Sequence, residues 1–254
     1  MSGAGGETES STELPSFVDF VPVDAHSQFF GLTKHEWVPI IMSATIIIFL
    51  GIFSILATRR LRKVPGKLQS FLEIVVEGLE NFTKSQMGRA AGPFIPFIGT
   101  LFIYIFAMNM LGQIPLFHSP TSNFNTTIAL TLIVFFVTHY QGVKNNGIVG
   151  YLKHMGGKPI WLAPLVFPLH LMQELLSRPL SLSMRLFGNV MGEDTIIAIF
   201  IGISPFLLGF IPLPMHLPMV FLALLGSTIQ AMIFSLLASF YIAGAIGIHE
   251  DEHH

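Results

Sequence analysis

The sequence predicts an all-α membrane protein with about five transmembrane crossings. Of its 254 residues, 52% are hydrophobic and only 11% are charged, whereas roughly one-quarter of the residues in a soluble domain are charged. The mean hydropathy is +0.67, and the charges gather in clusters separated by long apolar stretches. Runs of about 20 apolar residues can cross a ~30 Å hydrocarbon core. We therefore expect the charge clusters in loops between spans and the lipid bilayer as the first partner.

The composition also excludes several classes of protein. The chain has no cysteine, which rules out disulfide scaffolds, thiolate metal sites and cysteine nucleophiles. Its thirteen basic residues form no extended stripe, so no nucleic-acid partner is expected. The densest basic cluster, at residues 59–63, directly follows an apolar run and indicates a membrane anchor.

The charge pattern predicts one membrane domain between two polar tails. Residues 1–36 are acidic and carry no basic, apolar start of the kind found in a signal peptide. Basic residues mark the cytoplasmic ends of spans, which places the N-terminal tail outside the cell. Residues 37–248 form the membrane domain, and 249–254 form a cytoplasmic tail.

Hydrophobic periodicity and chain breaks give the expected elements. A first span at 38–58 is followed by an amphipathic surface helix at 67–89, in which apolar residues recur every three or four positions between acids. A charge-free stretch predicts a hairpin with spans at 93–117 and 126–142. Residues 159–179, broken by prolines, suit a re-entrant or tilted element. Two long C-terminal helices, 180–204 and 218–247, form a final hairpin.

Three ionisable residues stand inside an otherwise apolar predicted helix: Arg185, Glu193 and Asp194. An arginine at bilayer depth costs about 2.5–3.5 kcal/mol on insertion scales, so it normally faces protein or water and marks a functional site. The structural alternative is an arginine that reaches the interface or forms an ion pair and merely orients the helix. Arg178, beside Pro179, suits such an anchoring role better.

Helical geometry places these polar residues on particular faces. Arg185 and Asn189 lie one turn apart, and Gly188 and Gly192 keep that face shallow enough for a neighbouring helix to approach. In the last helix Gln230 interrupts a long apolar run. Polar residues of this kind often only bond a neighbouring helix, for a gain of about 0.6 kcal/mol. Two further polar residues fall near the same face: Ser227 and Tyr241.

The stretch Arg178–Asp194 reads RPLSLSMRLFGNVMGED and resembles the signature of subunit a of rotary ATP synthases. In that family an Arg-Leu-Phe-Gly-Asn core is followed by an acidic residue. The strings IQAMIF around Gln230 and MNMLGQIP at 108–115 strengthen the resemblance, which runs from about residue 30 to 248. Some family members have an aspartate at the position of Gly112 and a histidine at that of Ala223, which this chain lacks.

The resemblance implies a stator beside a rotating ring of small hairpin subunits, each with one carboxyl group at mid-membrane. It implies that Arg185 is the essential arginine, and that Glu193 or Asp194 lines an external half-channel, with either one possible. Asn189 and Gln230 would hydrate the path or position the arginine. Weaker candidates for the proton path, some of them replacing missing family residues, are Asn109, Gln113, His170, Glu174, Ser227 and Tyr241.

The resemblance also implies partners and location. These are the c-ring, a peripheral-stalk subunit b and the remainder of the synthase, in a bacterial inner membrane or less readily an organelle membrane. The chain itself would carry out no ATP chemistry and need no cofactor or metal. An independent transporter is a second reading, although no inverted repeat is visible. A metalloenzyme using the histidine-rich end of the chain is a third, although zincin spacing is lacking.

Overall fold

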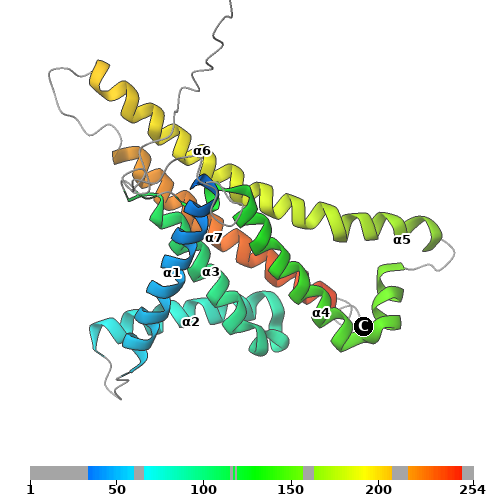
Figure 1. Ribbon diagram of the computed structural model, residues 1–254. Coiled ribbons are helices and arrows are strands. Elements are labelled where there is room, and N and C mark those ends of the chain that lie inside the picture. Colours follow the sequence, from blue (N-terminus) through cyan, green and yellow to red (C-terminus); the bar gives the residue numbers. More distant parts are fainter. Residues whose placement is uncertain are drawn as a thin grey trace, which may run out of the picture.

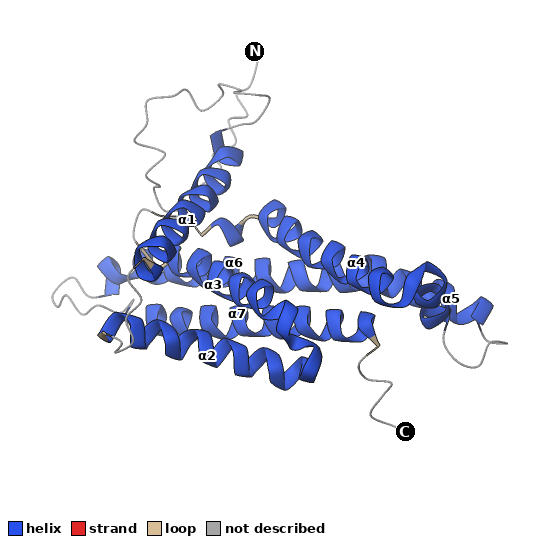
Figure 2. Cartoon of the chain, turned by 90° about the horizontal axis from the view of Figure 1, so that it is seen from below, coloured by secondary structure: helices blue, strands red, loops and turns tan. Residues whose placement is uncertain are grey.

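The computed structural model describes residues 34–59, 66–114, 117, 119–156, 163–207 and 217–247. All regular elements within these ranges are helical (Figures 1 and 2). The α-helices are α1 (Lys34–Thr58), α2 (Lys67–Met87), α3 (Ile95–Leu111), α4 (Phe124–Gly156), α5 (Ala163–Met172), α6 (Arg178–Leu207) and α7 (Leu217–Ile246). Two 3₁₀ segments, η2 (Gly88–Phe94) and η3 (Pro120–Ser122), and a π-helical turn, η5 (Gln173–Ser177), complete the elements. The predicted all-helical class is confirmed.

Four stretches of the described chain are long and apolar enough to cross a membrane. They are Trp37–Thr58, Gln69–Leu111, Phe124–Ile148 and Val220–Ile246. The second stretch combines α2, η2 and α3. The predicted count of about five crossings also includes α6, which carries Arg185, Glu193 and Asp194 and is not among these four stretches. Residues 1–33 and 249–254 of the predicted tails, and basic residues 60–63, lie outside the described residues.

Helix α7 lies at the centre of the bundle, where it packs against α2, α3, α4 and α6. The side of α7 that meets these helices is lined by small residues, including Ala231, Ser235 and Ala238, each fully buried. Small side chains let helix backbones approach closely in a membrane, where packing replaces the hydrophobic effect between helices. Helices α6 and α7, of 30 residues each, pack against each other, and Figure 1 shows both as long straight helices. The predicted C-terminal hairpin helices are therefore present.

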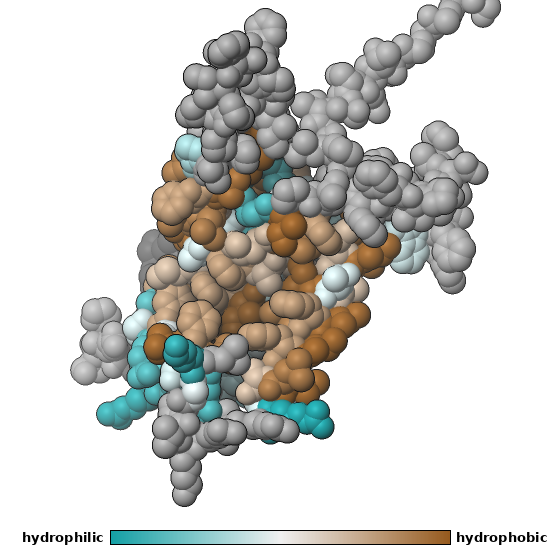
Figure 3. Space-filling model, turned by 90° about the vertical axis from the view of Figure 1, so that its left-hand side faces the viewer, coloured by the Kyte–Doolittle hydropathy of each residue, from teal (hydrophilic) through white to brown (hydrophobic). Residues whose placement is uncertain are grey.

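The outer helices present apolar side chains to their surroundings. Helix α1 meets α3 and η3 through few residues, with Met42 and Ile46 buried and side chains such as Phe49 and Ile55 exposed. A hydrogen bond between the hydroxyls of Ser43 and Tyr104 joins α1 to α3. Figure 3 shows apolar side chains over much of the middle of one face, with hydrophilic side chains mainly above and below them. Such a surface suits lipid rather than water.

Helix α2 is the predicted amphipathic helix and ends within two residues of the expected boundary. Its side toward α3 and α7 carries buried Thr83 and Met87, while Phe71 and Ile74 are exposed. The helix stops at Gly88, whose φ of 55° is open mainly to glycine. The chain then turns through η2 into α3.

Helices α3 and α4 differ from the predicted spans 93–117 and 126–142. Helix α3 ends early, at Leu111, because the chain turns at Gly112, where a Cβ atom would lie 2.7 Å from Cβ of Ser119. Helix α4 extends further because Gly147, with φ 67° and ψ 164°, allows a sharp kink rather than a stop. After the kink the ring of Tyr151 packs against Gly142.

The proline-broken stretch predicted at 159–179 becomes α5 and the π-turn η5, which continue into α6. The amide N–H of Arg178 donates to the carbonyl of Gln173, five residues earlier. A proline inside an α-helix clashes with the carbonyl four residues before it. The wider π-turn lies directly before Pro179 and relieves this clash. Helix α6 thus begins at the end of an irregular turn.

Candidate functional site

Arg185 is an exposed cation on an apolar helix. Its side chain lies on α6, and within the described part of the chain it makes no hydrogen bond or ion pair. On the same face, Cβ atoms built at Gly188 and Gly192 would meet nothing within 4 Å. The guanidinium and the two glycines therefore form an open face of α6, which we call the arginine face. A charged side chain on an apolar helix is normally found next to an anionic group or water.

Three contacts fix α6 and α7 in one antiparallel register. Nδ2 of Asn189 donates to Oε1 of Gln230 over 2.6 Å. The carboxylate of Glu193 lies against Gly226, where an added Cβ would collide with Oε1 of Glu193. At the other end of the pair, the guanidinium carbon of Arg178 lies 5.0 Å from the centre of the Tyr241 ring. The spacings match, since eleven residues separate Arg178 from Asn189 and Gln230 from Tyr241.

The region around Gln230 is a buried polar site. Gln230 is 2% exposed, and its Nε2 has no hydrogen-bond partner among the described residues. Ser227, one turn earlier, is also buried and lies near the Glu193 carboxylate. Asp194 is half-buried. Buried amide and hydroxyl groups with free hydrogen-bonding capacity can hold water, the usual medium for proton movement through a protein.

A second buried polar cluster joins the end of α3 to η3. The hydroxyl of Thr121 donates to Oδ1 of Asn109 over 2.7 Å and lies 2.6 Å from the hydroxyl of Ser119. Nδ2 of Asn109 and Oε1 of Gln113 are buried without a partner among the described residues. The structure brings Asn109 and Gln113 to one end of the bundle. No hydrogen bond between described residues links this cluster to Asn189 or Gln230.

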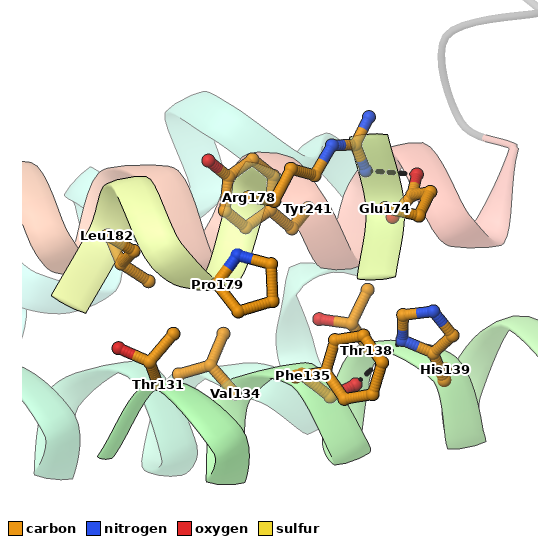
Figure 4. A pocket seen from close by; sticks show the side chains of 10 residues that line it. All are labelled: Thr131, Val134, Phe135, Thr138, His139, Glu174, Arg178, Pro179, Leu182 and Tyr241. Atoms are coloured by element: carbon orange, nitrogen blue, oxygen red, sulfur yellow. Dashed lines mark hydrogen bonds and ion pairs between the residues drawn. The ribbon is translucent and has the colours of Figure 1, made fainter. Parts of the chain in front are cut away.

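The remaining predicted residues lie around the start of α6. Glu174, in the π-turn, forms an ion pair with Arg178. These two residues and Tyr241 line a cavity of about 20 Å³ between α4, α6 and α7 (Figure 4). Tyr241 contributes the face of its ring to Arg178, and its hydroxyl makes no hydrogen bond within the described residues. His170 is exposed on α5 and does not line the cavity.

Sequence reasoning missed several residues of these sites. Thr138 and His139 of α4 also line the cavity, and their Oγ1 and Nε2 atoms are buried without partners in the described chain. No local pattern marks them, because α4 is distant in sequence from α6. Gly226 could have been found, since it is one turn before Gln230 on the face that meets α6. The described residues contain no cluster of three or more potential metal ligands.

The fold and the site define a class of protein, a multi-pass helical membrane protein in which ionisable and amide side chains meet along an antiparallel helix pair. The family model described as ATP synthase A chain matches residues 38–243. The chain belongs to this family.

Relatives agree along most of the chain. It is 45% identical over 201 residues to "ATP synthase subunit a 3" of Pelobacter propionicus, covering 79% of this chain and 84% of the relative. It is 46% identical over 201 residues to "ATP synthase subunit a" of Geotalea daltonii, with the same coverage. The protein of that name from Protochlamydia amoebophila is 38% identical over 239 residues, covering 91% of this chain and 88% of the relative. The resemblance found in the sequence is confirmed.

Proposed function

We propose that this chain is the proton-translocating stator subunit of a rotary ATP synthase. It works beside a rotating c-ring of small hairpin subunits and is held by a peripheral-stalk subunit b. Ion flow through it drives rotation of the ring, and ATP is made elsewhere in the complex. Family membership supports the general role. The arginine face supports the particular role of translocating protons beside the c-ring.

The exposed, unpaired guanidinium of Arg185 is the observation that carries this proposal. Among the described residues nothing neutralises it, and Gly188 and Gly192 keep the surface around it low. A helix that carries a carboxylate at the same depth would fit this face in shape and in charge. The proposed occupant is therefore one helix of a ring subunit, exchanged for the next at each step of rotation.

The chemistry of arginine suits the proposed task. A guanidinium does not lose its proton in a protein, so Arg185 can attract a carboxylate and favour its ionised form without carrying the proton itself. Its fixed positive charge also repels hydronium and prevents a direct leak past the ring. Lysine would serve less well, because a buried ammonium group shifts its pKa readily.

Two offset half-channels would deliver and collect the protons. We assign Glu193 or Asp194 to the external half-channel, with Asn189 and Gln230 hydrating the path or positioning Arg185. The contact of Glu193 with Gly226 and the free Nε2 of Gln230 support this assignment, because they bring acid and amide groups together between α6 and α7. Ser227 is buried in the same region. The cluster of Asn109 and Gln113 would extend this polar lining.

Glu174 and His170, which lie before the start of α6, would replace the aspartate and the histidine that this chain lacks at Gly112 and Ala223. Glu174 lines the cavity of about 20 Å³ beside Arg178 and Tyr241. The chain would lie in a bacterial inner membrane, with its N-terminus outside the cell and its C-terminus in the cytoplasm. The electrical part of the driving force contributes about 2.3 kcal/mol per charge per 100 mV.

Partner identity is the first test of the proposal. The tagged chain is purified in mild detergent and the attached subunits are identified by mass spectrometry. Recovery of a ring of small hairpin subunits together with an ATPase head is expected. A stable particle of this chain alone that transports ions would instead support the transporter reading.

The second test removes the charge. Arg185→Ala should assemble normally but abolish proton-driven ATP synthesis in vesicles, since nothing else on the arginine face would ionise the ring carboxylate. Arg89→Ala is the matched control, because Arg89 is an exposed arginine on η2 away from α6. Normal synthesis by assembled Arg185→Ala complexes would refute the role given to Arg185.

A further inference from the structure

The start of α6 carries a cluster that the proposed function does not explain. Arg178 forms an ion pair with Glu174 on one side and stacks over the ring of Tyr241 on the other (Figure 4). Arg178 and Tyr241 belong to different helices and are far apart in sequence, and both side chains are about half-buried. A guanidinium over an aromatic ring is attracted by the charge distribution of the ring, most strongly where water is excluded.

This cluster lies at the π-turn that joins α5 to α6, where it can affect the orientation of α6. Glu174 lies inside the π-turn Gln173–Ser177, and Arg178 is the first residue after it. Pro179 disfavours a regular α-helical turn at this place, and the wider π-turn allows α6 to rotate relative to α5 unless a contact with another helix holds it. Such a rotation would turn Arg185 away from its face. The ion pair of Glu174 and Arg178 spans the π-turn, and the contact of Arg178 with the ring of Tyr241 holds the turn against α7.

Tyr241 contributes its ring to this cluster, and its hydroxyl is unused. The ring face lies under Arg178, and the hydroxyl makes no hydrogen bond within the described residues. A residue of the proton path would need the hydroxyl, whereas a stacking platform needs only the aromatic face. Tyr241→Phe should therefore be inactive if Tyr241 belongs to the proton path, and active if Tyr241 only supports Arg178 with its ring.

We propose that Arg178 and Tyr241 are positioning residues that lock the π-turn and thereby set the rotation of α6 that presents Arg185. Glu174 completes the lock by pairing with Arg178 across the turn. Tyr241 acts through its aromatic ring and not as a proton carrier. The activity test of this proposal rests on the proposed function, whereas the distance test described below does not.

The activity test compares variants that keep or remove the ring. In assembled complexes, Tyr241→Phe should retain proton-driven ATP synthesis within about twofold, while Tyr241→Leu should lose about fivefold, the scale of a cation–π contact at a partly exposed site. Arg178→Gln should resemble Tyr241→Leu. Tyr140→Leu is the matched control, since it removes an exposed contact in which Lys144 lies 5.9 Å from the centre of the Tyr140 ring. This control should leave synthesis unchanged.

The distance test measures the orientation of α6 directly. The chain has no cysteine, so cysteines introduced at Met191 on α6 and Met232 on α7, both exposed, can be spin-labelled specifically. Their distance distribution is measured by pulsed electron paramagnetic resonance on the full chain in lipid nanodiscs. Tyr241→Leu and Arg178→Gln should shift or broaden the distribution, whereas Tyr241→Phe and Tyr140→Leu should not.

Three results would overturn the proposal. If Tyr241→Phe is as inactive as Tyr241→Leu, the hydroxyl is required. If Tyr241→Leu loses synthesis without changing the distance distribution, the ring does not position α6. If it changes the distribution but keeps full synthesis, the orientation does not matter for function. Should Tyr241→Leu fail to accumulate, Arg178→Lys, which keeps the charge but not the planar stacking group, is expected to show the same shift with reduced synthesis.

Discussion

Asn189 and Gln230 are 41 residues apart in sequence, and the side-chain amide of Asn189 donates to that of Gln230 over 2.6 Å. This bond lies between the contact of Glu193 with Gly226 and the contact of Arg178 with Tyr241. All three belong to one antiparallel register of α6 and α7. Arg185 is therefore held on a helix whose position is fixed on both sides of it.

The amide pair should contribute measurable coupling between the two helices. Asn189→Ala and Gln230→Ala are each expected to destabilise the chain, and the double variant to lose less than the sum. The expected coupling energy is about 0.6–1.7 kcal/mol, the range for hydrogen bonds between membrane helices. Unfolding of the four variants in mixed detergent micelles measures it. Strict additivity would show that the bond contributes nothing to stability.

The close approach of Glu193 to Gly226 predicts a size limit at residue 226. Gly226→Ala would place a methyl group against Oε1 of Glu193, so the carboxylate must move or the helices must separate. Overpacking of this kind costs about 1–3 kcal/mol. Proton-driven ATP synthesis and thermal stability should both fall, and Glu193→Asp, which shortens the side chain, should partly restore stability in the double variant.

Gly244→Ala is the control for this variant. Gly244 lies on the same helix, but an added Cβ there meets nothing within 4 Å. It should leave both stability and synthesis unchanged. Equal damage from Gly226→Ala and Gly244→Ala would mean that helix flexibility, and not contact with Glu193, explains the effect.

Most helices could be predicted because apolar runs and charge clusters mark their ends. The amphipathic helix and the C-terminal pair were placed within a few residues of α2, α6 and α7. The predicted ends of α3 and α4 were wrong because a glycine determines where each helix turns. Helix α3 ends at Leu111 because Gly112 meets Ser119, and α4 continues past its first lysine because Gly147 allows a kink.

The candidate site could be predicted only in part, because its residues are drawn from distant segments. Charge inside an apolar helix identified Arg185, and the family resemblance identified Asn189 and Gln230. Their hydrogen bond bears out the expected closeness of α6 and α7. The stacking of Arg178 on Tyr241 could not be predicted, since a π-turn shifts the helix by one residue and depends on contacts with other helices.

The buried cluster at the end of α3 should depend on the hydroxyl of Thr121. Thr121→Val would leave Oδ1 of Asn109 and the hydroxyl of Ser119 without a shared partner in a fully buried position. An unsatisfied buried polar group costs about 1–3 kcal/mol. The free energy of unfolding in detergent should fall by that amount, while Thr121→Ser, which keeps the hydroxyl, should lose less.

Thr45→Val provides the comparison for Thr121. Thr45 is exposed on α1, and its hydroxyl donates only to the carbonyl of Ile41 in its own helix. Its removal should change the free energy of unfolding by no more than a few tenths of a kcal/mol. A similar loss from both variants would argue that the Thr121 network is not specifically stabilising.

The arginine face should tolerate bulk in the isolated chain but not in the complex. A Cβ at Gly188 meets nothing within 4 Å, so Gly188→Leu should leave the thermal stability of the purified chain nearly unchanged. In the complex the same side chain would fill the space that the ring helix is proposed to occupy. Mass spectrometry should then find the ring subunits depleted from tagged complexes. Gly51→Leu, at an equally open position on α1, should retain the ring. Full retention of the ring by Gly188→Leu would place the ring on another face, because a leucine at the centre of a close helix contact cannot be accommodated without separating the helices.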